Sequence, residues 1–372
     1  MTAALIGSFF FVIIIKSMKH NFGAGPCILP QKVFGEAADA VKDFNGLSIL
    51  EISHRSADFV AVMDEAQSLV KEALNVPNGY SVLFLQGGAS LGFTISALNM
   101  MRDSKKAGYI NTGTWAKGAI NEAKAVGIDV NVFASSEDKN FNYIPKNYSV
   151  PNDVDFIHYT SNNTIFGTQF QSIVDTTLPL VCDMSSDIFS KSVDVSKFDI
   201  IYAGAQKNLG PAGATLYIVK DEILGKSTSP FMPKYLNLKN HVEKDSMLNT
   251  PPVFSVYTSM LNLRDLIANG GVDAMQERNA AKANLLYNEI DANPMFKAAV
   301  QGEDRSQMNV TFLLENDSLK SEFDAMWNNA EIIGLKGHRS VGGYRASMYN
   351  ALALDSVKVL TDVMKEFTRT KG

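Results

Sequence analysis

Residues 199–213, DIIYAGAQKNLGPAG, begin as a continuous apolar run and continue through a lysine, Lys207, into a glycine-rich turn. Two similar apolar runs come earlier, FIHY at residues 156–159 and LPLVC at residues 178–182. Short apolar runs bounded by turn residues are typical of strands that are buried on both faces of a parallel sheet. These stretches therefore predict an α/β fold built on a mostly parallel sheet.

Strand and helix patterns alternate on both sides of these runs. The other predicted strands lie at residues 81–85, 108–110, 130–133 and 215–219. The predicted helices lie at residues 33–43, 58–74, 91–101, 115–125, 255–267, 272–290 and 355–367. The helix-rich stretch after residue 255 leads away from the sheet, so we predict a large α/β domain followed by a smaller C-terminal α/β domain.

The composition is that of a globular enzyme. A chain of 372 residues is too long for one ordinary core, and 46% hydrophobic with 20% charged residues excludes a disordered or collagen-like chain. A net charge of −5 gives no general attraction to nucleic acid or anionic membrane. The two cysteines, Cys27 and Cys182, lack metal-ligand spacing and favour a reducing compartment. We therefore expect a cytoplasmic protein with no metal, nucleic-acid or membrane partner.

The N-terminus carries an apolar run at residues 3–15 that is too short to span a bilayer comfortably. Lysines follow this run instead of preceding it, and no small-residue cleavage site stands behind it, unlike in a signal peptide. Met18 opens the stretch MKHNFGAGP, where the globular pattern begins. We interpret Met18 as the native start and residues 1–17 as an extension that is not native. The alternative is a membrane anchor or an export signal.

Polar side chains follow the three apolar runs. The first run leads into the polar stretch Ser161-Asn162-Asn163-Thr164, the second into Asp183 and the third into Gln206-Lys207. Ligands of open α/β sheets lie outside the carboxyl ends of the strands, so we expect one polar pocket there. A lysine amine beside apolar walls suits Schiff-base chemistry, although a lysine at a strand end can also simply reach solvent. Asp183 could pair with the ring nitrogen of a pyridoxal cofactor or cap the next segment.

Four further motifs could contribute to a ligand site. QGGAS at residues 86–90 could cradle a phosphate at a helix N-terminus, and Trp115 in NTGTW (111–115) could stack on an aromatic cofactor. A plain glycine turn and a core tryptophan are the alternatives. Two basic clusters could bind carboxylate or phosphate, or could be solvated surface. They consist of His54 and Arg55, and of His338, Arg339 and Arg345 in GHRSVGGYR (337–345).

The motif AGAQKNLGPAG (203–213) resembles the phosphoserine aminotransferase family, in the class V group of fold type I pyridoxal-phosphate enzymes. The resemblance extends in family order through NFGAGP (21–26), SHR (53–55), QGGAS, NTGTW, SNNTIFGTQ (161–169), CDMSSD (182–187), MLNTPP (247–252) and GHRSVGGYRASMYNA (337–351). It covers nearly all of the chain from residue 19 onward. It implies a large seven-stranded domain at residues 30–268, and a small domain formed by residues 269–372 with residues 19–29.

The resemblance also implies roles for single residues. Lys207 would form the Schiff base with pyridoxal 5'-phosphate and move the substrate proton, Asp183 would pair with the ring nitrogen, and Trp115 would stack on the ring. Thr164 would lie near the phenolic oxygen of the ring. The cofactor phosphate would be held by Ala89, Ser90 and Gln206, and by Asn249 and Thr250 of the other subunit of a homodimer. Arg345 would take the substrate α-carboxylate. The substrate phosphate or the distal carboxylate of glutamate would be held by His54, Arg55, His338 and Arg339.

The implied reaction transfers the amino group of glutamate to 3-phosphohydroxypyruvate, giving O-phosphoserine and 2-oxoglutarate. The resemblance also implies action on phosphohydroxythreonine in pyridoxine synthesis. Another class V aminotransferase is the main alternative. A cysteine desulfurase is disfavoured because neither Cys27 nor Cys182 suits a mobile catalytic loop late in the chain. A nicotinamide-dependent oxidoreductase is disfavoured because QGGAS lacks the G-x-G-x-x-G pattern. A membrane-tethered binding protein has only the N-terminal apolar run in its favour.

Overall fold

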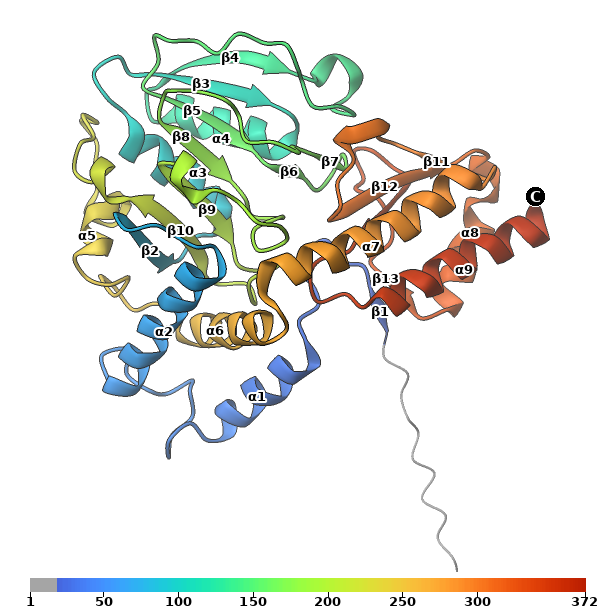
Figure 1. Cartoon of the computed structure of the whole chain (residues 1–372), viewed down its shortest axis with the longest axis horizontal. Coiled ribbons are helices and arrows are strands. Elements are labelled where there is room, and N and C mark those ends of the chain that lie inside the picture. Colours follow the sequence, from blue (N-terminus) through green and yellow to red (C-terminus); the bar gives the residue numbers. More distant parts are fainter. Residues whose placement is uncertain (1–18) are drawn as a thin grey trace, which may run out of the picture.

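The computed structural model describes residues 19–372, which form two hydrophobic cores side by side (Figure 1). The interpretation of Met18 as the native start and of residues 1–17 as an extension lies outside the described residues. None of the helices between residues 19 and 372 combines the length and hydropathy that crossing a bilayer requires.

The larger core surrounds a seven-stranded sheet with the strand order β2-β10-β9-β8-β5-β3-β4. Its strands are β2 (Tyr80–Leu85), β3 (Lys106–Asn111), β4 (Asp129–Ser135), β5 (Phe156–Thr160), β8 (Leu180–Asp183), β9 (Ile200–Gly204) and β10 (Thr215–Lys220). All are parallel except β10, which is antiparallel to both of its neighbours, β2 and β9. The predicted mostly parallel sheet is confirmed.

Helices cover both faces of this sheet, which explains why its strands read as continuous apolar runs. On one face, α3 (Gly88–Met100) and α4 (Thr114–Ala125) pack on alternate strand residues. On the other face lie α1 (Gln31–Lys42), α2 (Ala57–Ala73) and α6 (Val253–Ala268). A short hairpin, β6 (Asn162–Asn163) with β7 (Thr168–Gln169), and the short helix α5 (Leu238–Val242) complete this part.

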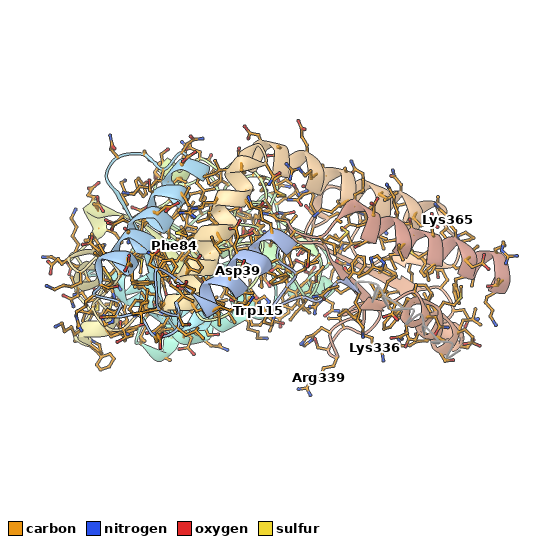
Figure 2. The ribbon with its side chains drawn as sticks, turned by 90° about the horizontal axis from the view of Figure 1, so that it is seen from below. Asp39, Phe84, Trp115, Lys336, Arg339 and Lys365 are labelled. Carbon is orange, nitrogen blue, oxygen red and sulfur yellow. The ribbon has the colours of Figure 1, made fainter. Side chains whose placement is uncertain are left out.

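The smaller core lies beside a three-stranded antiparallel sheet. Its strands are β11 (Phe296–Ala298), β12 (Asn309–Leu314) and β14 (Tyr344–Ser347), covered by α8 (Lys320–Asn329) and α9 (Leu354–Lys371). The N-terminal strand β1 (His20–Asn21) pairs with β13 (Ile332–Ile333). In Figure 2 the two parts lie side by side, with Phe84 of β2 in one and Lys365 of α9 in the other.

One long helix, α7 (Gly271–Ala292), joins the two cores. Its first turns contribute Val272 and Met275 to the larger core, and its last turns contribute Leu286 and Ile290 to the smaller one. Between them, Lys282 is buried and donates hydrogen bonds to the carbonyl oxygens of Met348 (3.1 Å) and Tyr349 (2.8 Å). The predicted division into residues 30–268 and 269–372 with 19–29 stays a prediction, because α7 belongs to both cores.

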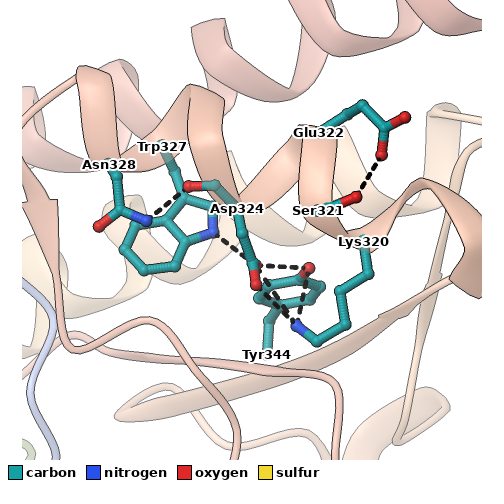
Figure 3. A network of polar contacts seen from close by, with 7 residues as sticks. All are labelled: Lys320, Ser321, Glu322, Asp324, Trp327, Asn328 and Tyr344. Atoms are coloured by element: carbon teal, nitrogen blue, oxygen red, sulfur yellow. Dashed lines mark hydrogen bonds and ion pairs between the residues drawn. The ribbon is translucent and has the colours of Figure 1, made fainter.

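A polar network fixes the start of β14 (Figure 3). The carboxylate of Asp324 accepts hydrogen bonds from the Tyr344 hydroxyl at 2.9 Å, from Trp327 Nε1 at 3.1 Å and from Lys320 Nζ at 3.2 Å. Tyr344 is the first residue of β14, and Arg345 follows it. The network therefore anchors the strand that carries Arg345 to helix α8.

Candidate active site

The carboxyl ends of the adjacent strands β5, β8 and β9 border a cavity of about 560 Å³. Nine of the residues singled out in the sequence line it, namely Ala89, Ser90, Trp115, Thr164, Asp183, Gln206, Lys207, His338 and Arg345. Parallel strands place their carboxyl ends at one edge of a sheet, which explains why residues far apart in the chain meet here. The volume is in the range of small-molecule sites.

Lys207 and Asp183 provide opposite charges at this edge. Lys207 follows β9 by three residues, and Asp183 is the last residue of β8. Burial lowers the pKa of the Lys207 amine, and the charge of Asp183 opposes that shift. Burial raises the pKa of the Asp183 carboxyl, whose Oδ1 accepts a hydrogen bond from the backbone N–H of Ser185 at 2.9 Å. An amine with a lowered pKa is neutral more of the time and is a better nucleophile.

Trp115 presents an aromatic surface to the cavity. Its side chain is 38% exposed, and its ring centre lies 5.8 Å from Lys207 Nζ. The indole Nε1 donates a hydrogen bond of 2.9 Å to the Thr164 hydroxyl, which fixes the orientation of the ring. Trp115 lies in the first turn of α4, in agreement with the predicted helix at residues 115–125. Gly113 precedes that turn, and an added Cβ there would meet Phe166 Cδ2 at 2.9 Å.

The N-terminus of α3 provides an anion site at the cavity wall. Gly87, with φ +99°, turns the chain from β2 into α3, and an added Cβ would lie 2.5 Å from the Leu91 side chain. The first N–H groups of a helix have no partner within the helix and favour an anion. Ala89 and Ser90 lie in this first turn and line the cavity together with Gln206. A phosphate group is therefore a suitable ligand for this end of the cavity.

Arg345 lines the cavity from β14 of the smaller core. Its Nη1 donates a hydrogen bond of 3.1 Å to the carbonyl oxygen of Thr164. Its Nε is buried and has no hydrogen-bond partner among the described residues. A buried guanidinium N–H without a partner is costly, so an anionic ligand is the natural partner. His338 also lines the cavity, and its Nδ1 lies 2.7 Å from the Ser340 hydroxyl.

Five of the predicted residues do not line the cavity. Arg339 is exposed and projects away from the molecule in Figure 2. His54 is buried just before α2 with no partner for its Nε2 among the described residues, and the adjacent Arg55 is exposed. Asn249 and Thr250 lie next to the QGGAS turn. Asn249 Nδ2 donates to Gln86 Oε1 at 2.7 Å, and Gln86 Nε2 donates to the carbonyl oxygen of Thr250 at 3.2 Å.

The sequence interpretation missed several residues of the cavity wall. Ser185 supplies the backbone N–H that holds Asp183, and an aspartate two residues before a donor is a common turn pattern that could have revealed it. The segment Ala24-Gly25-Pro26 also lines the cavity. It is held beside the lysine because the backbone N–H of Cys27 donates to the carbonyl oxygen of Gln206 at 3.0 Å. Phe93 and Ile165 are apolar wall residues without a polar signal.

Taken together, the cavity contains an amine, a carboxylate, an aromatic face and two groups that can bind anions, the N-terminus of α3 and Arg345. Among the described residues, no group of three or more His, Cys, Asp or Glu side chains could hold a metal ion. The arrangement therefore favours a flat, phosphorylated organic cofactor with a basic ring nitrogen and a carbonyl group within reach of the lysine amine.

Comparison with known proteins gives consistent matches. The model of the family "Aminotransferase class-V" matches residues 19–360. Phosphoserine aminotransferase of Flavobacterium psychrophilum is 60% identical over 351 residues, which cover 94% of this chain and 98% of that protein. The solved phosphoserine aminotransferase of Bacillus circulans subsp. alkalophilus is 41% identical with a TM-score of 0.92, covering 95% and 99% of the two chains. The PLP-bound phosphoserine aminotransferase from Trichomonas vaginalis is 34% identical with a TM-score of 0.89, covering 94% and 100%.

Proposed function

The chain belongs to the class V aminotransferases, and from this premise we propose that it transfers the amino group of L-glutamate to 3-phosphohydroxypyruvate. The products are O-phospho-L-serine, which enters serine biosynthesis, and 2-oxoglutarate. One observation carries the proposal: Lys207, Asp183 and Trp115 line one cavity together with Arg345, whose buried Nε has no partner among the described residues.

The residues of the cavity fit pyridoxal 5'-phosphate. When bound, this cofactor supplies an electron sink for the substrate Cα. The hydrogen bonds to the Asp183 carboxylate among the described residues come from Ser185, with the backbone N–H bound to Oδ1, so Oδ2 is available for a protonated ring nitrogen. The N–H groups of Ala89 and Ser90 suit the phosphate, assisted by Gln206. Trp115 and Thr164 suit the ring face and its polar edge.

Lys207 would hold the cofactor through its amine, and the same amine would move the proton at the substrate Cα. Burial lowers the pKa of its amine, which increases the share of the neutral, proton-accepting form. Asp183 keeps the ring nitrogen protonated by supplying a fixed negative charge. Trp115 excludes water from one side of the cavity with its ring.

The substrate specificity rests on groups with positive charge. We assign the α-carboxylate that all amino-acid substrates share to Arg345, because Arg345 lines the cavity and its buried Nε has no partner among the described residues. The phosphate of phosphoserine and the distal carboxylate of glutamate are assigned to His338, Arg339, His54 and Arg55. Only His338 of these lines the cavity of its own chain.

We assign the remaining groups to a homodimer in which each subunit completes the site of its partner. Asn249, Thr250 and Arg55 lie outside the cavity of their own chain, and two of them, Thr250 and Arg55, are exposed. A second copy would bring Asn249 and Thr250 to the cofactor phosphate and the His54–Arg55 pair to the substrate phosphate. The reducing compartment that two free cysteines suit supports placing the enzyme in the cytoplasm.

Substrate comparison tests the proposed reaction. The purified enzyme is incubated with glutamate and either 3-phosphohydroxypyruvate or unphosphorylated 3-hydroxypyruvate, and the formation of 2-oxoglutarate is measured. We expect kcat/KM for the phosphorylated acceptor to be higher by about a thousandfold, the range of several charge-assisted hydrogen bonds. Equal values for the two acceptors would favour another class V aminotransferase. The same assay in reverse with 4-phosphohydroxy-L-threonine tests a further role in pyridoxine biosynthesis.

Mixed dimers test the shared site. Two variants are prepared, the single variant Lys207→Ala and the double variant Arg55→Ala with Thr250→Ala. We expect each of them to be inactive alone. Dissociated and reassociated together, they form hybrids in which one of the two sites has every wild-type residue, so about a quarter of wild-type activity returns. No recovery, with hybrids detected by mass spectrometry, would contradict the shared site.

A further inference from the structure

A hydrogen-bonded pair of polar side chains is buried between the large sheet and the helices α3 and α4. His158 lies on β5 and Tyr202 lies on β9, and both side chains are 0% exposed. The Tyr202 hydroxyl lies 2.8 Å from His158 Nε2. Such groups are costly to bury, so their presence in an otherwise apolar layer requires an explanation.

The strand register places this pair directly behind Asp183. Asp183 of β8 pairs with Tyr202 of β9 and with Thr160 of β5, whereas His158 pairs with Val181. Paired residues of parallel strands point to the same face of the sheet. The bond from Tyr202 to His158 therefore crosses β8 between Val181 and Asp183, on the face to which the Asp183 side chain belongs.

The surroundings hold this pair in place. Helix α3 passes so close to the Tyr202 ring that a Cβ added to Gly92 would lie 2.7 Å from Tyr202 Cδ2. Burial lowers the pKa of His158 to about 3, so the imidazole is neutral at working pH. The tautomer of the neutral imidazole sets the direction of this bond: with its proton on Nε2, His158 donates to the Tyr202 oxygen and leaves the phenolic hydrogen free for another acceptor, whereas with its proton on Nδ1 it accepts that hydrogen. We take the Nε2 tautomer. The hydroxyl of Thr160 is also buried without a partner among the described residues.

Asp183 is an acceptor with donors from a single residue. Among the described residues, the hydrogen bonds to its carboxylate come from Ser185, through its backbone N–H at 2.9 Å and through its side chain. Burial raises the pKa of Tyr202, and the nearby charge of Asp183 raises it further. A carboxylate that must stay ionised in a buried site needs additional donors behind it.

We propose that Tyr202, held by His158, is a positioning residue that orients Asp183 and keeps its carboxylate ionised for the ring nitrogen of the cofactor. The proposal rests on the proposed function, in which Asp183 pairs with that nitrogen. Tyr202 acts from behind the cavity, since it is absent from the cavity wall. A hydrogen bond to the charged form of a group stabilises that form, and orienting partners of this kind raise the affinity for the bound group.

The alternative is that Tyr202 serves only as an aromatic core residue. Tyr109 offers a matched control in the same layer. It is 1% exposed, its ring stacks on His158 with centres 4.9 Å apart, and its hydroxyl has no partner among the described residues. Tyr109 lies on β3, two strands away from β8. Tyr202→Phe and Tyr109→Phe therefore remove the same atom from equally buried rings at different distances from Asp183.

The test measures cofactor binding to the apoenzyme. Apoenzymes are titrated with pyridoxal phosphate while tryptophan fluorescence is followed, and their melting is recorded separately. We expect Tyr202→Phe to raise the dissociation constant about ten- to hundredfold, the range of a hydrogen bond to a charged group, and Tyr109→Phe to change it by less than about twofold. His158→Leu, which releases the Tyr202 hydroxyl, should weaken binding in the same direction. Equal effects of the two tyrosine variants would overturn the proposal.

A double-mutant cycle with Asp183→Asn separates this inference from the proposed function. If Tyr202 acts through the carboxylate, Tyr202→Phe has little further effect on affinity once Asp183→Asn is present, whereas a packing role gives additive effects. Additive effects would overturn the positioning role while leaving the role of Asp183 intact. If Asp183→Asn alone leaves cofactor affinity unchanged, the proposed function of Asp183 fails, and the positioning role fails with it.

Discussion

Replacement of Arg345 tests how the smaller core contributes to substrate binding. The guanidinium donates one hydrogen bond through Nη1, to the carbonyl oxygen of Thr164 at 3.1 Å. Its buried Nε has no partner among the described residues, so the Nε edge of the guanidinium remains for a carboxylate. Arg345→Ala removes that edge, and Arg345→Lys keeps the charge but loses the planar fork.

The structure sets the size of the effect. Two charge-assisted hydrogen bonds to a substrate carboxylate contribute about 3–6 kcal/mol, which corresponds to a loss of about 10²–10⁴ in kcat/KM for Arg345→Ala. Arg345→Lys retains one donor and the charge, so the expected loss is about 10–10². The loss applies equally to glutamate and phosphoserine because the α-carboxylate is common to both substrates.

The assay compares kcat/KM for the two amino acids in each variant. Arg339→Ala is the control because Arg339 is an exposed residue assigned to the substrate phosphate. It should lower kcat/KM for phosphoserine more than for glutamate. If Arg345→Ala costs less than about tenfold for both substrates, or discriminates between them as Arg339→Ala does, the assignment of the α-carboxylate to Arg345 is wrong.

Three further predictions concern the lysine of the cavity and the scaffold around it. Lys207→Ala should abolish turnover in the glutamate half-reaction, followed by cofactor absorbance, and turnover near the wild-type level would contradict its role. Hydrogen bonds from Tyr344, Trp327 and Lys320 outweigh burial and hold the pKa of Asp324 below 3.8. Asp324→Asn should therefore cost about 1–2 kcal/mol of stability in urea unfolding at pH 7, and this difference should shrink as the pH falls below 3.8. Burial lowers the pKa of Lys282 from 10.5 to about 7, so the unfolded chain binds more protons between these values. The urea midpoint of the wild type should rise relative to that of Lys282→Met from pH 7 to pH 10, whereas a constant difference would mean that Lys282 stays charged.

The strands of the large sheet could be predicted from the sequence because their apolar runs are continuous. The strand predicted at residues 178–182 starts two residues too early, because β8 begins at Leu180. The preceding Pro179 lacks the N–H group that pairing with a neighbouring strand requires. The cavity residues Lys207 and Asp183 could be predicted because each is a charged residue directly after such a run.

Other parts of the site could not be predicted, for physical reasons. His158 and Tyr202 lie within runs that read as apolar strands, so the polar bond between them depends on a register that only the folded sheet defines. The cavity of a single chain does not include His54, Arg55, Asn249 and Thr250, so their assigned roles depend on the proposed homodimer.

The position of β10 between β2 and β9 has a consequence for how the chain is made. The apolar strand β2 pairs only with β10 in the sheet, and residues 86–214 separate the two in the sequence. At about 5–20 residues per second on the ribosome, β10 is synthesised on the order of 10 s after β2. During that time its hydrogen-bonding edge has no partner strand, which makes the segment a natural substrate for chaperones and a point where newly made chains can aggregate.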